Sequence, residues 1–127
     1  MSRYHEVYEG WRRDPEAFWK AAATDISWYT LWDKVFDPYA GQYGRWFVGA
    51  ECNTAYNCLD RHVAAGRGDQ RALIYDSPVT GQKRTYTYNQ LTDEVATLAQ
   101  VLLDHGVTTG DRVILYMPMI PQALFGM

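Results

Sequence analysis

The chain has 127 residues, of which 47% are hydrophobic, 21% charged and 15% aromatic, and its formal net charge is −3. This size and composition are typical of one globular domain and exclude a disordered chain. No Lys/Arg cluster is larger than a pair, so a nucleic acid is not expected as a partner. The longest uncharged run, residues 113–127, has 15 residues, which is too short for a membrane span of roughly 18 or more.

The first residues and the cysteines together predict a cytoplasmic protein. Glu6 and Glu9 lie where a signal peptide would have its apolar core, so no export signal is expected. Cys52 and Cys58 are six positions apart, a spacing that fits neither a CxxC motif nor a disulfide framework. Two unreactive thiols are typical of a reducing compartment.

Aromatic residues are concentrated near the start of the chain. All five tryptophans lie in the first 46 residues, at Trp11, Trp19, Trp28, Trp32 and Trp46. Tryptophan side chains dominate core and interface energetics because of their large area. We therefore expect protein to cover these rings; the alternative is an exposed platform on which sugars or bases stack.

Two short helices are expected at the start. Ser2 is a candidate cap for a helix over residues 3–12, and Asp14 followed by Pro15 is a strong start signal for a second helix. Residues 27–52 have neither helical nor alternating periodicity, with at most one short strand over residues 45–48. A long irregular segment of this kind is expected to wrap along another surface.

Regular structure is predicted from Asn53 onward. The expected elements are, in chain order, a helix over 53–65 that ends at Gly66, a hairpin of strands over 71–76 and 83–88, a helix over 88–105 that starts with a capping box of Thr87 and Gln90, a strand over 112–117, and a helix that begins near Pro121. The strand is continuously apolar, as expected where both faces are buried in a parallel sheet. The predicted fold class is α/β. An irregular, Trp-rich helical segment (residues 1–52) precedes the β-β-α-β-α start of a larger domain with an incomplete sheet (residues 53–127).

Searches for catalytic patterns give no candidate active-site residue. The sequence has no glycine-rich phosphate loop, no zinc-binding helix motif and no nucleophile elbow. Asp60 and Arg61 are expected in solvent and His62 in a packed helix face, since positions i and i+2 of a helix point to different sides. His105 is expected as a helix-end residue, and Arg67-Gly68-Asp69 as a chance match to an adhesion tripeptide. No catalytic, cofactor-binding or metal-binding residue is predicted.

A series of short elements occurs in fixed order along nearly the whole chain. The series comprises Tyr8 in a Y-x-G-W pattern, Phe18-Trp19, Arg45-Trp46-Phe47, Asn57-Cys58-Leu59-Asp60-Arg61-His62, Thr85-Tyr86-Thr87-Tyr88 with Leu91, Gly106-Val107 with Gly110-Asp111-Arg112-Val113, and Tyr116-Met117-Pro118-Met119-Ile120-Pro121. It resembles the start of short-chain AMP-forming acyl-CoA synthetases, the acetyl-CoA and propionyl-CoA synthetases of the adenylate-forming superfamily. Arg45-Trp46-Phe47 followed by Asn53 and Asn57 is more similar to the propionyl type.

The resemblance implies a two-step ligase that uses ATP, Mg and coenzyme A. In such enzymes a short-chain carboxylate, here propionate or in the alternative acetate, attacks ATP to give an acyl-adenylate and diphosphate, and coenzyme A then displaces AMP. The family's phosphate loop, nucleotide pocket and lysine-bearing lid have no match in this sequence, so no ligand residue is carried over. The chain itself is expected to be an inactive N-terminal fragment. A free-standing aromatic-rich binding or scaffold module is the hypothesis from another class.

The last residues lead to an expectation about assembly. The sequence stops at Met127, inside an apolar run that begins at Val113. Neighbouring strands from later sequence would be missing, which leaves an apolar strand and an open sheet edge uncovered. We therefore expect the chain to associate with itself through this unfinished sheet.

Overall fold

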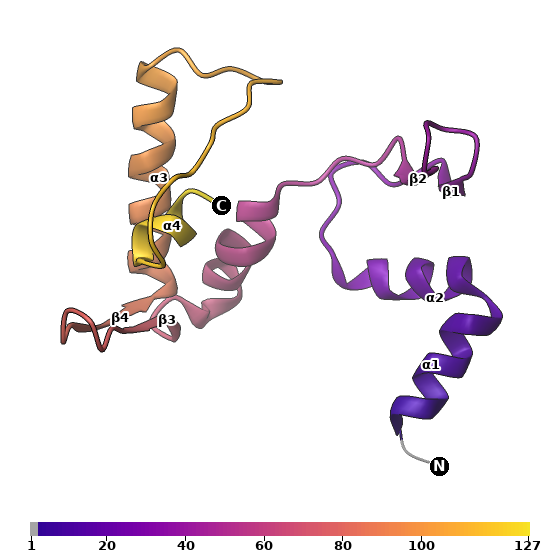
Figure 1. Ribbon diagram of the computed structural model, residues 1–127, viewed down its shortest axis with the longest axis horizontal. Coiled ribbons are helices and arrows are strands. Elements are labelled where there is room, and N and C mark those ends of the chain that lie inside the picture. Colours follow the sequence, from indigo (N-terminus) through magenta and orange to yellow (C-terminus); the bar gives the residue numbers. More distant parts are fainter. Residues whose placement is uncertain (1–2) are drawn as a thin grey trace. The chain divides into compact units, whose positions relative to one another are not determined.

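A computed structural model describes residues 3–127, which form two compact units, residues 3–57 and residues 58–127. The fold is mixed, with helices and two separate two-stranded antiparallel sheets (Figure 1). In chain order the elements are α1 (Arg3–Arg13), α2 (Pro15–Ala22), the 3₁₀ turn η1 (Ala23–Asp25), β1 (Lys34–Asp37), β2 (Arg45–Val48), the π-helical turns η2 (Tyr56–Asp60) and η3 (Val63–Arg67), β3 (Arg71–Asp76), β4 (Lys83–Thr87), α3 (Tyr88–Asp104) and α4 (Pro121–Phe125). No helix in this described range is long and apolar enough to cross a membrane.

The two opening helices confirm the sequence prediction. The Asp14 side chain accepts a hydrogen bond from the Ala17 backbone N–H at 2.9 Å, and Pro15 occupies the first turn of α2. Such a cap satisfies one of the backbone donors that a helix start leaves unpaired. The predicted Ser2 cap of α1 lies outside the described residues.

A second strand in the first unit corrects the prediction of an irregular segment over residues 27–52. β1 pairs with β2 as an antiparallel hairpin in which Phe36 lies opposite Trp46. An isolated bridge between Thr30 and Glu51 extends this pairing. The sequence signal is absent because β1 has only four residues, and its pairing depends on the intervening turn and on cross-strand aromatic contact.

In the second unit, local end signals act as predicted. Asn53 caps the helical stretch before Gly66 by accepting from the Tyr56 backbone N–H at 2.9 Å, and Gly66 adopts φ 79° in the last helical turn. The β3–β4 hairpin is present, and the capping box of Thr87 and Gln90 starts α3. These devices supply partners for backbone groups that would otherwise be unpaired.

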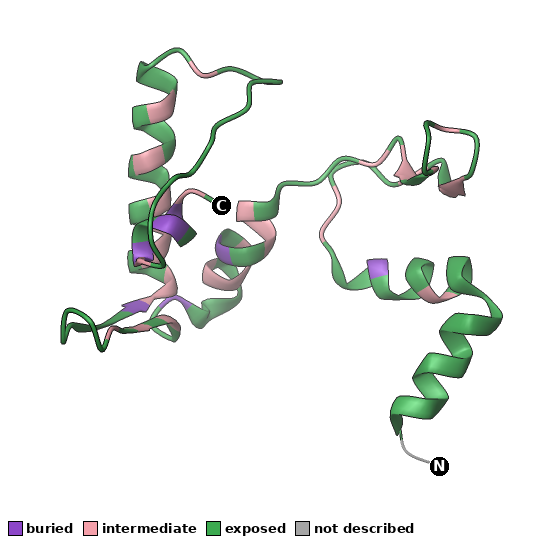
Figure 2. Ribbon diagram, viewed as in Figure 1, coloured by how far each residue is buried: buried purple, intermediate pink, exposed green. Residues whose placement is uncertain are grey.

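The core of the second unit is small. Its buried hydrophobic side chains are Leu59, Tyr86, Ala123 and Phe125, and the Tyr86 and Phe125 rings meet edge to face at 5.6 Å. In the first unit Ala23 is the one buried hydrophobic residue among those the structure describes. Buried positions are accordingly sparse in Figure 2.

Residues 112–117 do not form the predicted strand. They connect α3 to α4 without pairing to any described residue, and Ile114 and Tyr116 are almost fully exposed. A strand is stabilised by the hydrogen bonds of a neighbour, and neither described sheet supplies one here. The apolar segment is uncovered in this chain, as expected, and its burial between neighbouring strands stays a prediction.

Candidate functional site

An aromatic cluster joins α2 to the β1–β2 hairpin in the first unit. Trp46 stands at its centre, with ring centroids 4.7 Å from Phe36 and 6.5 Å from Trp19. Trp28 and Trp32 extend the cluster, and the Trp28 indole N–H donates to the Ala23 carbonyl at 2.8 Å. Contacts between these rings hold α2 against the β1–β2 hairpin.

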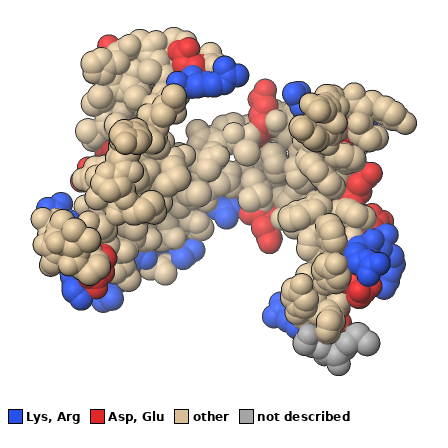
Figure 3. Space-filling model, in the orientation of Figure 1, with Lys and Arg blue, Asp and Glu red and all other residues tan. Residues whose placement is uncertain are grey.

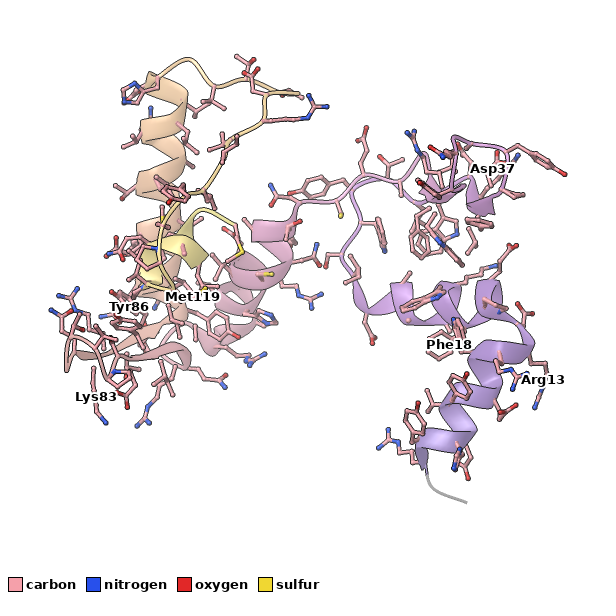
Figure 4. The ribbon with its side chains drawn as sticks, in the orientation of Figure 1. Arg13, Phe18, Asp37, Lys83, Tyr86 and Met119 are labelled. Carbon is pink, nitrogen blue, oxygen red and sulfur yellow. The ribbon has the colours of Figure 1, made fainter. Side chains whose placement is uncertain are left out.

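The α1–α2 groove, lined by Tyr4, Val7, Tyr8, Trp11, Phe18 and Trp19, is an open apolar hollow of about 220 Å³. Phe18 lies on the side of α2 that faces α1 (Figure 4). The groove residues that belong to α1 recur at i, i+3, i+4 and i+7, which is the spacing of one helix face. The groove was not predicted from the sequence, although this spacing is the signal that indicates it. The lining offers no charged group, so the groove is suited to binding apolar or aromatic surface.

Tryptophan burial is only partly as expected. Trp28 and Trp32 are half-buried, whereas Trp11, Trp19 and Trp46 are 36–44% exposed. The described residues of the first unit form no second layer over these three rings, so their coverage by protein stays a prediction.

Asn57 connects two distant parts of the first unit. Its side-chain oxygen accepts from the Ser27 backbone N–H at 2.8 Å, and its side-chain nitrogen donates to the Ser27 carbonyl at 2.9 Å. An amide can satisfy a backbone donor and a backbone acceptor at once. Asn57 therefore has a structural role.

His62, Arg67 and Tyr88 form a cluster in the second unit. The Arg67 guanidinium lies 5.4 Å from the centre of the Tyr88 ring and donates to Nδ1 of His62 at 3.1 Å. Because a guanidinium has no acceptor, this contact requires an unprotonated Nδ1. Partial burial, and then the charges of Arg67 and Arg61, hold the pKa of His62 below its usual value.

The neighbours of His62 fit a structural role. His62 is half-buried and Asp60 exposed, as predicted, whereas Arg61 is half-buried, which corrects its expected solvation. Arg67 also donates to the Gln70 side chain at 2.7 Å, and Asp69 accepts from Asn89 at 3.3 Å; the chance match at 67–69 stays a prediction. Gly68 between them is buried.

The groove between β4 and α3 in the second unit lacks the groups that bind a nucleoside triphosphate. This groove, of about 410 Å³, is lined by Arg84, Thr85, Tyr86, Gln90 and Glu94. Arg84 is its one cation and Glu94 is a carboxylate, whereas phosphates are bound by several cations or converging backbone N–H groups. Lys83, beside this groove in sequence, is paired with Asp76 at 2.7 Å. On the face shown in Figure 3, basic side chains occur in small separate groups.

Metal chemistry has no site in the part of the chain that the structure describes. Residues 3–127 contain no group of three or more His, Cys, Asp or Glu side chains placed to hold a metal. Cys52 and Cys58 are both free and exposed. His105 is exposed at the C-terminal cap of α3. The absence of catalytic and ligand residues from this chain stays a prediction.

Comparison with known families gives two adjacent matches. Residues 4–58 match the family described as acetyl-coenzyme A synthetase N-terminus, and residues 60–127 match the AMP-binding enzyme family. The second match covers more than half of the chain, so the chain belongs to the family of AMP-binding enzymes.

Individual relatives agree with this family. Human "Acyl-CoA synthetase short-chain family member 3, mitochondrial" is 47% identical over 126 residues, which cover 99% of this chain and 18% of that protein. An acetyl-coenzyme A synthetase of Mycobacterium tuberculosis is 43% identical over 122 residues, 96% of this chain and 19% of its own length. The solved structure of acetoacetyl-CoA synthetase from Streptomyces lividans superposes with a TM-score of 0.81 at 32% identity, over 99% of this chain and 19% of that one. The chain thus spans about a fifth of the length of these relatives.

Proposed function

We propose that the chain is the N-terminal portion of an AMP-forming short-chain acyl-CoA synthetase. The observation that carries the proposal is the order of the two family matches, N-terminus followed by AMP-binding enzyme, along one chain. In the proposed reaction a carboxylate oxygen attacks the α-phosphorus of ATP and releases diphosphate. The coenzyme A thiolate then attacks the acyl carbon and releases AMP. Mg would act with the phosphates in the first step.

Propionate is the acid that we propose as the preferred substrate. The proposal is supported by Arg45-Trp46-Phe47 followed by Asn53 and Asn57, the elements that resemble the propionyl type. Acetate is the alternative. The relatives include proteins named for short-chain, acetyl and acetoacetyl substrates. Membership of the family therefore does not identify the carboxylic acid.

The two portions of the chain have different proposed roles. We propose that residues 1–52 are a wrapping segment whose aromatic groove packs on protein surface, and that residues 53–127 begin the adenylating domain. The apolar lining of the α1–α2 groove supports the first role. Because the grooves described above do not fit a nucleotide, ATP and coenzyme A would be bound by residues outside this chain.

The test is the acid dependence of the whole gene product. Acyl-CoA formation from ATP and coenzyme A is measured with propionate, acetate and acetoacetate, each at a range of concentrations. We expect the highest kcat/KM with propionate. A higher kcat/KM with acetate would make acetate the preferred acid. Absence of thioester formation with every short-chain acid tested would contradict the proposed function.

A binding module is the second candidate, supported by the exposed α1–α2 groove. It would bind an aromatic or sugar ring by stacking. Tryptophan fluorescence of the chain that shifts on adding an oligosaccharide would favour this function, and no response would leave the packing role.

The proposed location is the cytoplasm. Two exposed free thiols support a reducing compartment. The human relative carries the word mitochondrial in its name. Fluorescence microscopy of the tagged whole protein in its own cells distinguishes the two compartments.

A further inference from the structure

Phe47 in β2 has a backbone conformation that bulky residues rarely adopt. Its φ is 50°, and among the residues that the structure describes it is the one non-glycine residue with a positive φ. Contacts of Cβ with the backbone make this left-handed region unfavourable for every residue except glycine. A strained residue of this kind persists only where its surroundings hold it.

Glycine supplies the other positive φ angles of the β1–β2 hairpin and its exit. Gly41 and Gly44 lie in the turn with φ 84° and 70°, and Gly49 follows β2 with φ 83°. Glycine at position 47 would adopt the same backbone without strain. A phenylalanine at this position therefore indicates that the ring, more than the path of the backbone, maintains the conformation.

The side chain of Phe47 lies where a regular strand would not place it. β1 and β2 pair in one register on both sides of Phe47, so no residue is inserted there as in a β-bulge. Neighbouring side chains of a regular strand point to opposite faces, whereas the ring centroids of Trp46 and Phe47 are 6.1 Å apart. The positive φ accounts for this proximity, because it turns the Phe47 side chain toward the face that carries Trp46.

The Phe47 ring contacts two tryptophans of the segment that leads into β1. Its centroid lies 5.1 Å from that of Trp32 and 5.5 Å from that of Trp28. Both tryptophans belong to residues 28–33, which we call the strap. Aromatic rings at these distances attract one another in addition to the area they bury, so these contacts offset the strain at Phe47.

The strap is attached through its backbone near both ends. The Tyr29 N–H donates to the Glu51 carbonyl at 2.7 Å, and the Asp33 N–H donates to the Val48 carbonyl at 2.9 Å. Within the described chain, the backbone of residues 31 and 32 makes no hydrogen bond. The middle of the strap is therefore held on β2 by the contacts of its tryptophan rings with Phe47.

We propose that Phe47 is a latch that holds the strap closed on β2 and that can open without unfolding of the hairpin. In the closed conformer, which the structure shows, the ring contacts with Trp28 and Trp32 hold Phe47 at positive φ. In the open conformer Phe47 has an extended backbone, and its ring lies on the opposite face of β2. The inference does not rest on the proposed function, since every contact involved lies within residues 28–51.

One residue couples the two changes of this latch. An extended Phe47 would point away from the face of Trp46, so relief of the backbone strain and loss of the contacts with Trp28 and Trp32 occur together. The strain at Phe47 lowers the free-energy difference between the closed and open conformers. Local opening of this kind differs from global unfolding because only the strap loses its contacts.

Hydrogen exchange of the whole gene product, followed by mass spectrometry of its peptides, tests the latch. In the original protein we expect residues 28–33 to exchange faster than the paired residues of β1 and β2. Phe47→Ala should accelerate exchange of the strap at least about tenfold, and the control Trp19→Ala less than about threefold. Trp19 is the matched control because it contacts the same aromatic cluster through Trp46 and lies outside the strap.

Three results would overturn the latch. They are a strap that exchanges no faster than the hairpin in the original protein, equal acceleration by Phe47→Ala and Trp19→Ala, and acceleration by Phe47→Ala that extends equally to β3 and β4. The last result would show global unfolding instead of local opening.

A comparison of Phe47→Gly with Phe47→Ala tests whether the ring holds the backbone. Both variants lack the ring, but only alanine is disfavoured at positive φ. If the ring holds the conformation, both variants relax to an extended strand, and their straps exchange at rates within about threefold of each other. Val35→Gly and Val35→Ala, in the middle of β1, measure the ordinary difference between these residues in this hairpin. Exchange more than about threefold faster for Phe47→Ala than for Phe47→Gly would show that the backbone path requires the positive φ, and would overturn the proposal.

Discussion

The side-chain amide of Asn57 forms two hydrogen bonds with the backbone of Ser27, which is thirty positions earlier in the chain. The same amide nitrogen lies 3.0 Å from the Asn53 carbonyl, one helical turn away. A single side chain thus joins the start of a helical segment to the region that leads into the β1–β2 hairpin. The Asn-Cys-Leu-Asp-Arg-His element, which carried much of the resemblance, begins with a residue whose role in this chain is to hold the backbone.

Replacing Asn57 tests this connection. Asn57→Asp keeps the acceptor for Ser27 N–H but loses the donor and places a carboxylate near the Ser27 carbonyl, so we expect about 1–2 kcal/mol lower free energy of unfolding. Denaturant unfolding followed by tryptophan fluorescence reports on the first unit, which holds all five tryptophans. Cys52→Ser, at an exposed free thiol, is the matched control and should change stability little. Equal effects of both variants would contradict the role of Asn57.

The capping box of α3 is tested in the second unit. Thr87 Oγ1 accepts from the Gln90 N–H at 3.3 Å, and Gln90 Oε1 accepts from the Thr87 N–H at 3.0 Å. Thr87→Ala should lower stability by about 1 kcal/mol, and Thr87→Ser should restore most of it. Thr97→Ala, in the exposed middle of α3, is the control: it loses only a bond to the Asp93 carbonyl and should be close to neutral, because alanine favours helix interiors. Circular dichroism during urea unfolding measures all three.

Two glycines in the β1–β2 turn separate backbone strain from steric clash. Gly41 and Gly44 adopt φ 84° and 70°, but a Cβ added at Gly41 would meet nothing within 4 Å, whereas one at Gly44 would lie 2.5 Å from Cζ of Phe36. Gly41→Ala should cost only the left-handed backbone penalty of about 1–2 kcal/mol. Gly44→Ala should cost about 1–3 kcal/mol more, because the Phe36 ring would have to leave its contact with Trp46. The prediction is wrong if both variants unfold at the same denaturant concentration.

How much of this structure the sequence predicted depends on whether an element is specified locally. The start of α2, the β3–β4 hairpin and the start of α3 were predicted because Asp14, the turn around Gly81 and the Thr87–Gln90 pair act within a few residues of themselves. β1 was missed because its four residues are recognised only with β2 opposite. For residues 112–117 the apolar pattern predicted a buried strand, but burial requires neighbours that the described chain does not provide.

The α1–α2 groove and the cluster of His62, Arg67 and Tyr88 were likewise not predicted, because each depends on contacts between separate elements. Motif searches detect chemistry that is concentrated in short spacings, and the sequence contains none for phosphate or metal. The α1–α2 groove was missed because it combines one face of α1 with Phe18 and Trp19 of the next helix. The cluster of His62, Arg67 and Tyr88 likewise joins residues from two separate helical segments, so no single spacing could reveal it.

The isolated chain is expected to be unable to activate a carboxylate. Adenylate formation requires the triphosphate to be bound and its charge stabilised, and the groove between β4 and α3 offers one cation beside a carboxylate. Diphosphate–ATP exchange with propionate or acetate and Mg²⁺ should therefore equal the rate without protein. The whole gene product in the same assay is the positive control. Exchange by residues 1–127 alone would show that a nucleotide site exists in this chain.

Protonation of His62 should weaken the second unit in mildly acidic solution. Partial burial, followed by the nearby charges of Arg67 and Arg61, lowers the pKa of His62 from its usual 6.5. Between 6.5 and the lower folded-state pKa, the unfolded chain binds a proton that the folded chain does not, so stability falls as pH decreases through this range. The proton would also occupy Nδ1, which accepts from Arg67 at 3.1 Å. Asp37 and Asp111 have pKa values lowered from 3.8, and their protonation lies below this range.

The measurement is the urea midpoint of the second unit, followed by circular dichroism from about pH 8 down to about pH 5.5. The original chain should lose stability over the lower part of this range, and His62→Gln should remove that dependence because glutamine does not titrate. His105→Gln is the matched control, because it removes an exposed histidine at the end of α3. Its urea midpoint should depend on pH as that of the original chain does. If His62→Gln retains the full dependence, or if His105→Gln removes it, then the contact between His62 and Arg67 is not its source.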